Sequence, residues 1–161
     1  MNLKIKKILS KKNKSKIICL TSYSKNFSEI LDKYTDIILV GDSLGSVLYS
    51  FDTTKKVKLD MMIQHSKSVR QGINKSLMVV DMPYNSYRNK FEALKNAKKI
   101  IKYSKADAIK LNKDGLSNQR CIREGQTDEV RREQLSYLTR CLKSTYKVVP
   151  LRSHISLSCS T

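Results

Sequence analysis

Four short apolar runs, separated by segments with helical spacing, constrain the fold of this 161-residue chain more than any other feature. The apolar runs lie at residues 16–20, 36–40, 77–80 and 106–111, and the segments with helical spacing lie at 27–33, 59–74 and 89–105. Strands that alternate with helices predict βαβ units and a parallel sheet. After Asp36 the second run is apolar throughout, which is typical of a strand covered on both faces. The sequence therefore predicts an α/β fold.

Two architectures fit this alternation: an open, doubly wound sheet and the closed (β/α)₈ barrel. No GxGxxG or GxxxxGK[ST] pattern follows any predicted strand, so the commonest nucleotide-binding sites are not predicted. The residues alone leave both architectures open.

The composition disfavours several classes of protein. A net charge of +18 would suit nucleic acid, but the lysines are scattered and are not interleaved with aromatic residues, so this partner is only an alternative. No apolar run reaches the ~18 residues of a membrane span, and residues 1–16 contain no signal-peptide core. The four cysteines show no CxxC spacing, which predicts free thiols. We therefore expect a cytoplasmic protein with no membrane partner.

Polar side chains follow three of the predicted strands. Gly41-Asp42-Ser43 follows the second run, Asp81 follows the third, and the fourth carries Lys110 and then Asn112. The carboxyl ends of parallel strands share one edge, where two carboxylates can converge on a hard cation such as Mg²⁺. Lys110 would neutralise an anionic substrate. An Asp in this position is also often only a turn or cap residue, so a structural role stays open.

Two further residues stand near this edge. His65 lies inside the predicted helix 59–74, and we interpret it as structural. Tyr23 follows the first strand, where its side chain either lines the same edge or packs beside it.

An ordered set of motifs then carries a family resemblance. Its members are Leu20-Thr-Ser-Tyr23, the IILVGDSLG run at 37–45, Asp52-Thr-Thr54, LDMMIQH at 59–65, VDMP at 80–83 and ADAIKL at 106–111. In this order and spacing they resemble the ketopantoate hydroxymethyltransferase family, over residues 3–111.

The resemblance implies a (β/α)₈ barrel and a cytoplasmic, Mg²⁺-dependent transferase of pantothenate and coenzyme A synthesis. The family moves a hydroxymethyl group from 5,10-methylenetetrahydrofolate to 3-methyl-2-oxobutanoate, which gives 2-dehydropantoate, and it assembles as a decamer. By position, Asp42 and Asp81 match its metal ligands. Asp42, Ser43, Asp81 and Lys110 match the residues that contact the 2-oxo acid.

The chain departs from the family pattern at two positions, one inside the matched region and one directly after it. Asn112 stands where the family has a metal-binding Glu, which leaves a weaker, neutral ligand. Ser24 stands where the family usually has Asp. The resemblance assigns no catalytic residue, because the family's catalytic Glu has no counterpart among Glu124, Glu129 or Glu133.

The composition changes near residue 113. Residues 1–113 hold 22 Lys and 2 Arg, whereas residues 114–161 hold 2 Lys and 6 Arg. We therefore expect a partial barrel of about four βα units over 1–113, followed by an unrelated tail over 114–161, hypothetically frameshifted. Because a barrel needs roughly 200–250 residues, the resemblance then predicts impaired activity for this chain.

One other enzyme class stays open. Mg²⁺-dependent carbon–carbon lyases or mutases of the isocitrate lyase-like kind share the barrel and the acid-lined metal site. The Asp81-Met82-Pro83 and Asp42-Ser43-Leu44-Gly45 segments fit that class less well.

Overall fold

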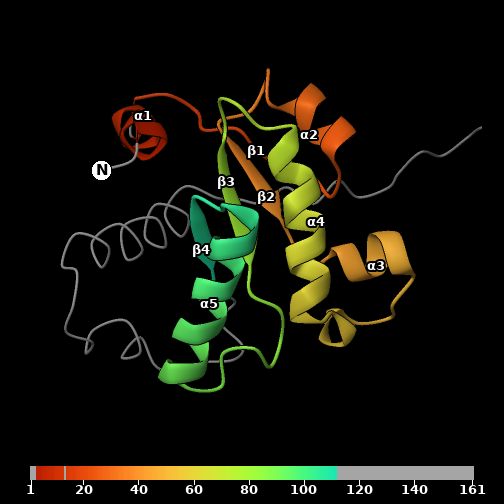
Figure 1. Ribbon diagram of the computed structural model, residues 1–161. Helices are drawn as coiled ribbons and strands as arrows, with labels where there is room; N and C mark the ends of the chain where they lie inside the picture. Colours follow the sequence, from red (N-terminus) through yellow and green to blue (C-terminus); the bar gives the residue numbers. More distant parts are fainter. Residues whose placement is uncertain (1–2, 13, 112–161) are drawn as a thin grey trace, which may run out of the picture.

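The described part of the chain is a parallel sheet with helices between its strands (Figure 1). The computed structural model describes residues 3–12 and 14–111. In chain order the elements are α1 (Leu3–Lys11), β1 (Cys19–Thr21), α2 (Lys25–Leu31), β2 (Ile37–Val40), α3 (Leu44–Tyr49), the 3₁₀ turn η1 (Thr54–Lys56), α4 (Leu59–Gln71), β3 (Leu77–Asp81), α5 (Lys90–Ser104) and β4 (Ala108–Lys110). The four predicted strands are confirmed; β4 is narrower than predicted, and β1 is shorter and ends one residue later than the predicted run at 16–20.

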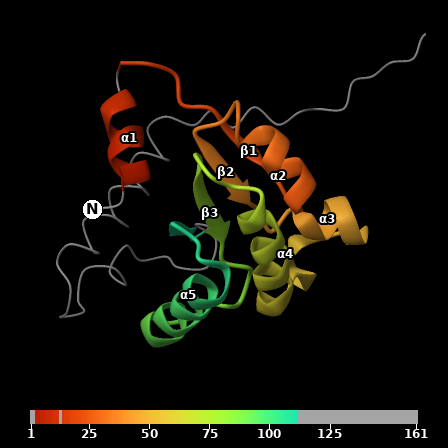
Figure 2. The same cartoon turned by 45° about the horizontal axis from the view of Figure 1, so that its top comes forward.

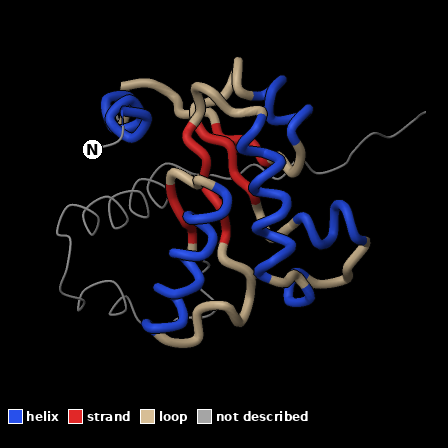
Figure 3. The backbone as a smooth tube through the Cα atoms, in the orientation of Figure 1, coloured by secondary structure: helices blue, strands red, loops and turns tan. Residues whose placement is uncertain are grey.

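The strand order is β1-β2-β3-β4, and every neighbouring pair is parallel (Figure 3). A doubly wound sheet reverses its strand order at a switch point, whereas successive units of a (β/α)₈ barrel add strands in sequence. No such reversal occurs within the described residues. The topology therefore favours the barrel over the open sheet.

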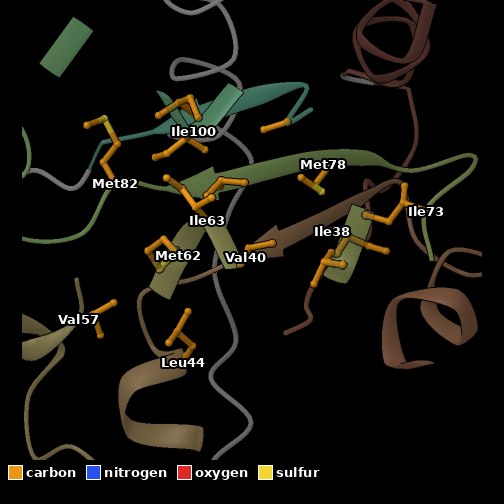
Figure 4. Close-up of a cluster of buried hydrophobic side chains, with 14 of the residues drawn as sticks. Ile38, Val40, Leu44, Val57, Met62, Ile63, Ile73, Met78, Met82 and Ile100 are labelled. Carbon is orange, nitrogen blue, oxygen red and sulfur yellow. The ribbon is translucent and has the colours of Figure 1, made fainter. Parts of the chain in front are cut away.

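The two faces of the sheet are buried by different helices. Ile38, Met78 and Ile109 point from the strands into a core shared with Met62 of α4 and Ile100 of α5 (Figure 4). The alternate strand residues form a second cluster with α1, whose members are Ile5, Ile8, Ile37, Leu77, Val79 and Ala108. Figure 2 shows α1 on the side of the strands opposite α4. Both faces are thus apolar, which explains the nearly continuous apolar strands.

The inward face of α5 differs from the sequence prediction. The periodicity predicts that five residues point inward: Phe91, Leu94, Ala97, Ile100 and Ile101. Ile100 is fully buried and Ala97 packs against the core, whereas Phe91, Leu94 and Ile101 are 78%, 54% and 40% exposed. The residues that face the sheet are Ala93, Ala97, Ile100 and Ser104, in which small side chains allow close approach. The prediction is therefore confirmed for Ala97 and Ile100 and wrong for the other three side chains.

Two helices were not predicted. In α1, Ile5 and Ile8 are buried, and two lysines hold the helix to the sheet: Lys4 Nζ donates to Ser76 O at 2.9 Å and Lys11 Nζ to Asp36 Oδ1 at 2.6 Å. The other, α3, has only six residues. No helix within the described residues is both long enough and apolar enough to span a membrane.

Three aspartates tie the strands together at their amino ends; Asp32 and Asp36 are buried, and Asp107 is partly buried. Asp36, just before β2, accepts the Ile18 N–H, and Asp107, just before β4, accepts the Met78 N–H of β3. Asp32 accepts the backbone N–H groups of Asn74, Lys75 and Ser76, just before β3. Burial alone would raise the pKa of Asp32, but these hydrogen bonds outweigh it and hold the pKa below its ordinary value.

The Asp32 contacts predict a loss of stability in Asp32→Asn. The amide keeps one oxygen acceptor but loses the charge, so unfolding at neutral pH should become about 1–3 kcal/mol easier. Because the folded pKa is lowered, the ionised carboxylate stabilises the fold above the unfolded value of 3.8, and this stabilisation is lost as the pH falls through the folded pKa. Urea unfolding of both proteins at falling pH should show the difference shrinking.

The matched control is Glu29→Gln, which removes a carboxylate from the exposed surface of the same helix. Its stability should change by less than about 0.5 kcal/mol. Equal losses in the two variants would contradict a specific role for Asp32.

Candidate active site

The predicted polar residues gather at the carboxyl edge of the sheet. Gly41, Asp42 and Ser43 form the turn between β2 and α3, and Asp81 ends β3. Lys110, the last residue of β4, stands opposite Asp81 in the strand register. The fifth expected residue, Asn112, lies outside the described residues.

Asp81 and Lys110 form the central ion pair of this edge. Lys110 Nζ donates to Asp81 Oδ1 at 2.7 Å, and the Asp81 side chain is only 4% exposed whereas that of Lys110 is 34% exposed. Burial raises the pKa of Asp81. The Lys110 charge and hydrogen bond counter this rise, the Asp42 charge adds to it, and the net pKa lies above the ordinary value.

Asp42 and Ser43 lie beside that ion pair. The backbone N–H of Asp42 donates to the Asp81 carboxylate, and the two carboxylates are close enough for one charge to shift the other's pKa. Ser43 Oγ lies 2.8 Å from the Tyr23 hydroxyl. Gly41 leaves room between these groups, because a Cβ there would sit 2.8 Å from Ser43 Oγ and 3.7 Å from Asp81 Oδ2.

Tyr23 thus lines the carboxyl edge of the sheet, which is one of the two positions that the sequence left open. His65 contacts the backbone of Tyr23. The Nδ1 atom of His65 lies 2.8 Å from the Tyr23 carbonyl oxygen, and its Nε2 atom lies 2.9 Å from the Tyr49 hydroxyl. Tyr49 is the residue that sequence reasoning missed, because the short helix α3 has no clear periodicity. The only available signal was its position five residues after Leu44 in the DSLG motif.

The donor set fits a hard divalent cation. Asp42 and Asp81 supply two carboxylates, and Mg²⁺ commonly takes one or two, with water and substrate oxygens at its other positions. Asp81 Oδ1 is paired with Lys110, while Oδ2 faces the space that a Gly41 side chain would fill. Among residues 3–12 and 14–111, no group of three or more His, Cys, Asp or Glu is arranged to hold a metal, so a zinc-type site is not indicated there.

An open groove of about 580 Å³ adjoins the end of β3. It is lined by the segment from Lys55 to Leu59, the segment from Pro83 to Ser86, and Glu92 and Asn96 of α5. Lys55 Nζ lies 5.3 Å from the centre of the Tyr84 ring.

These features define a parallel, barrel-type α/β protein with an acid pair and a lysine at the carboxyl edge of its strands. A model of the family described as ketopantoate hydroxymethyltransferase matches residues 2–154. The chain belongs to this family. The match favours it over the isocitrate lyase-like enzymes and over a basic nucleic-acid-binding module, which the sequence alone left open.

Several curated relatives carry the name 3-methyl-2-oxobutanoate hydroxymethyltransferase. The protein from Pelagibacter ubique is 69% identical over 111 residues, which are 69% of this chain and 43% of the relative. That from Rhizobium etli is 39% identical over 152 residues, 94% of this chain and 48% of the relative. That from Anaplasma marginale strain St. Maries is 47% identical over 111 residues, 69% of this chain and 40% of the relative. The chain thus spans less than half the length of these relatives.

The matches differ in how far along this chain the similarity to the family extends. The family model runs to residue 154, and the Rhizobium relative aligns over 152 residues, so both extend past the predicted limit at 111. The Pelagibacter and Anaplasma relatives align over 111 residues only. The division into 1–113 and 114–161 stays a prediction, and residues 112–161 lie outside the described part of the chain.

The ion pair predicts opposite effects of two substitutions on the pKa of Asp81. Lys110→Met should raise this pKa further, because it removes the positive charge 2.7 Å from Oδ1. Asp42→Asn should lower it, because it removes a neighbouring negative charge. Titration of the Asp81 carboxyl carbon by ¹³C NMR measures both shifts.

The control is Asp60→Asn, which removes a carboxylate whose side chain is 78% exposed and pairs with Lys99. It should leave the Asp81 titration unchanged. Shifts of the same sign in Lys110→Met and Asp42→Asn would contradict this account of the electrostatics.

Proposed function

We propose that this chain carries the metal- and 2-oxo acid-binding part of a hydroxymethyltransferase site. The reaction would transfer a hydroxymethyl group from 5,10-methylenetetrahydrofolate to 3-methyl-2-oxobutanoate and give 2-dehydropantoate and tetrahydrofolate, with one water consumed. The observation that carries the proposal is the buried Asp81, paired on one oxygen with Lys110 and bonded by the Asp42 N–H. Membership of the family supplies the identity of the substrates.

Each residue at the carboxyl edge would have a separate role in binding the 2-oxo acid. Asp42 and Asp81 would hold Mg²⁺, which when bound supplies Lewis-acid polarisation of the keto group. Lys110 is the more exposed partner of its ion pair, so its charge lies where a negative oxygen of the substrate would develop. The Ser43 hydroxyl is within reach of the same space and can donate to the substrate carboxylate.

The chemistry then needs three changes at the substrate. The proton on C3 is removed, and a bond forms between C3 and the one-carbon unit. Tetrahydrofolate leaves as water supplies the hydroxyl oxygen, and its two nitrogens take up the C3 proton and the second proton of the water. We assign no residue of this chain to the proton transfer. The described residues therefore account for binding and charge stabilisation, which can be measured apart from turnover.

By the same membership we infer a cytoplasmic protein of pantothenate and coenzyme A synthesis that assembles as a homo-oligomer, a decamer in the family. Its ligands would be small molecules, namely the 2-oxo acid and the folate.

Binding of 3-methyl-2-oxobutanoate tests the proposal directly. Calorimetry should show binding that requires Mg²⁺, and Asp42→Asn and Asp81→Asn should each weaken it by roughly tenfold or more, about 1.4 kcal/mol. Asp60→Asn, with the same change of charge at an exposed position, should bind as the unmodified chain does.

Two outcomes would count against the proposal. If binding is absent with Mg²⁺ present, or is equally strong in Asp81→Asn, the site at this edge is not the 2-oxo acid site. Formation of 2-dehydropantoate on addition of 5,10-methylenetetrahydrofolate is the separate test of the complete reaction, and rapid turnover would refute the expected impairment.

We propose that the groove beside β3 takes the folate donor. Folates carry an aromatic ring and glutamate carboxylates, which match Tyr84 and the cationic wall of Lys55, Lys56 and Lys58. The groove borders Pro83, two residues after Asp81, so a donor there would reach the same edge of the sheet.

The doubly substituted chain Lys55→Gln/Lys58→Gln should bind tetrahydrofolate roughly threefold to thirtyfold more weakly, with a reduced dependence on salt. Fluorescence titration measures the affinity. The control is Lys67→Gln, on α4 beside Tyr103 and away from the groove residues. Equal affinities for all three proteins would remove the groove from the donor site.

A further inference from the structure

His65 of α4 connects the loops of two different βα units. Its Nδ1 atom lies 2.8 Å from the carbonyl oxygen of Tyr23, between β1 and α2. Its Nε2 atom lies 2.9 Å from the hydroxyl of Tyr49, the last residue of α3, and the two rings meet edge to face at 86°. One partly buried imidazole therefore holds both loops.

These contacts fix the proton on the ring. A carbonyl oxygen only accepts, so the Nδ1 atom of His65 must carry the hydrogen. In the neutral ring Nε2 is then the acceptor, and the Tyr49 hydroxyl donates to it. The Tyr23 carbonyl thus selects one tautomer.

Tyr23 connects His65 to Ser43 of the candidate active site. Its backbone is held by His65, and its hydroxyl lies 2.8 Å from Ser43 Oγ. We propose that His65 is a positioning residue, which acts through Tyr23 to hold the Ser43 hydroxyl at the acid-lined edge. The positioning itself stands on these contacts, while its effect on substrate rests on the proposed function.

The chain offers a matched control on the same helix. Ser68 Oγ accepts the Lys25 N–H at 3.0 Å, so it also holds the segment after β1, but at the start of α2. Loss of this contact should loosen the segment without releasing Tyr23 from Ser43. A general loss of packing would affect both variants, whereas positioning through Tyr23 affects only the His65 variant.

The first measurement needs no ligand. The backbone amide signal of Ser43, in an ¹⁵N-resolved spectrum of the full chain, should move in His65→Ala and stay in place in Ser68→Ala. His65→Asn, whose amide N–H₂ group approximates the Nδ1 donor, should restore the signal, whereas His65→Gln should not. This Asn and Gln comparison also decides the case if His65→Ala does not fold. An unmoved Ser43 signal in His65→Gln would overturn the inference.

The second measurement is the affinity for 3-methyl-2-oxobutanoate with Mg²⁺. His65→Ala should weaken it roughly threefold to tenfold, which is typical for the loss of one hydrogen bond. In a Tyr23→Phe chain the same substitution should have no further effect, because the hydroxyl through which it acts is gone. Additive effects would overturn the inference. If the unmodified chain binds no oxo acid while the Ser43 signal behaves as expected, only the proposed function fails.

Discussion

The parallel register that sets Asp81 opposite Lys110 is the constraint on which the site depends. The two residues end neighbouring strands, so the backbone ladder itself brings a carboxylate and an ammonium within 2.7 Å. A buried carboxylate without such a partner would be costly, and the remaining rise in the pKa of Asp81 shows that the partner offsets only part of this cost. The raised pKa of Asp81 therefore follows from its buried position at the end of β3, and not from the arrangement of a loop.

Aspartates have different roles at the amino edge and at the carboxyl edge of the sheet. At the amino edge, Asp32, Asp36 and Asp107 accept backbone N–H groups and join segments that are far apart in the sequence. The pKa of Asp32 is lowered there, so its charge contributes to stability at neutral pH. At the carboxyl edge the pKa of Asp81 is raised, which is the opposite sign. This contrast separates a structural acid from a candidate functional one.

The sequence predicted the strands and the convergence of Asp42, Asp81 and Lys110, because apolar runs locate strands and parallel strands end at one edge. It predicted the buried face of α5 only in part: Ala97 and Ile100 face the core, but Phe91, Leu94 and Ile101 are exposed, and such large apolar side chains look like core residues in a sequence. Helix α3 was missed because six residues are too few to show a period. The contacts of His65 join residues 42 and 16 positions apart, and no local pattern reports such pairs.

The raised pKa of Asp81 also bears on the proposed metal. Because the folded chain binds this proton more tightly than the unfolded chain, Asp81 contributes most to stability below its unfolded pKa and loses that contribution as the pH rises. The ionised form of Asp81 therefore stabilises the fold less than the protonated form does, and Asp42 adds a like charge beside it. A dication held between the two acids would turn their mutual repulsion into shared attraction, so binding and folding would reinforce each other. In the proposed site, the same pair of neighbouring acids that costs the free chain stability would supply the attraction for a hard cation.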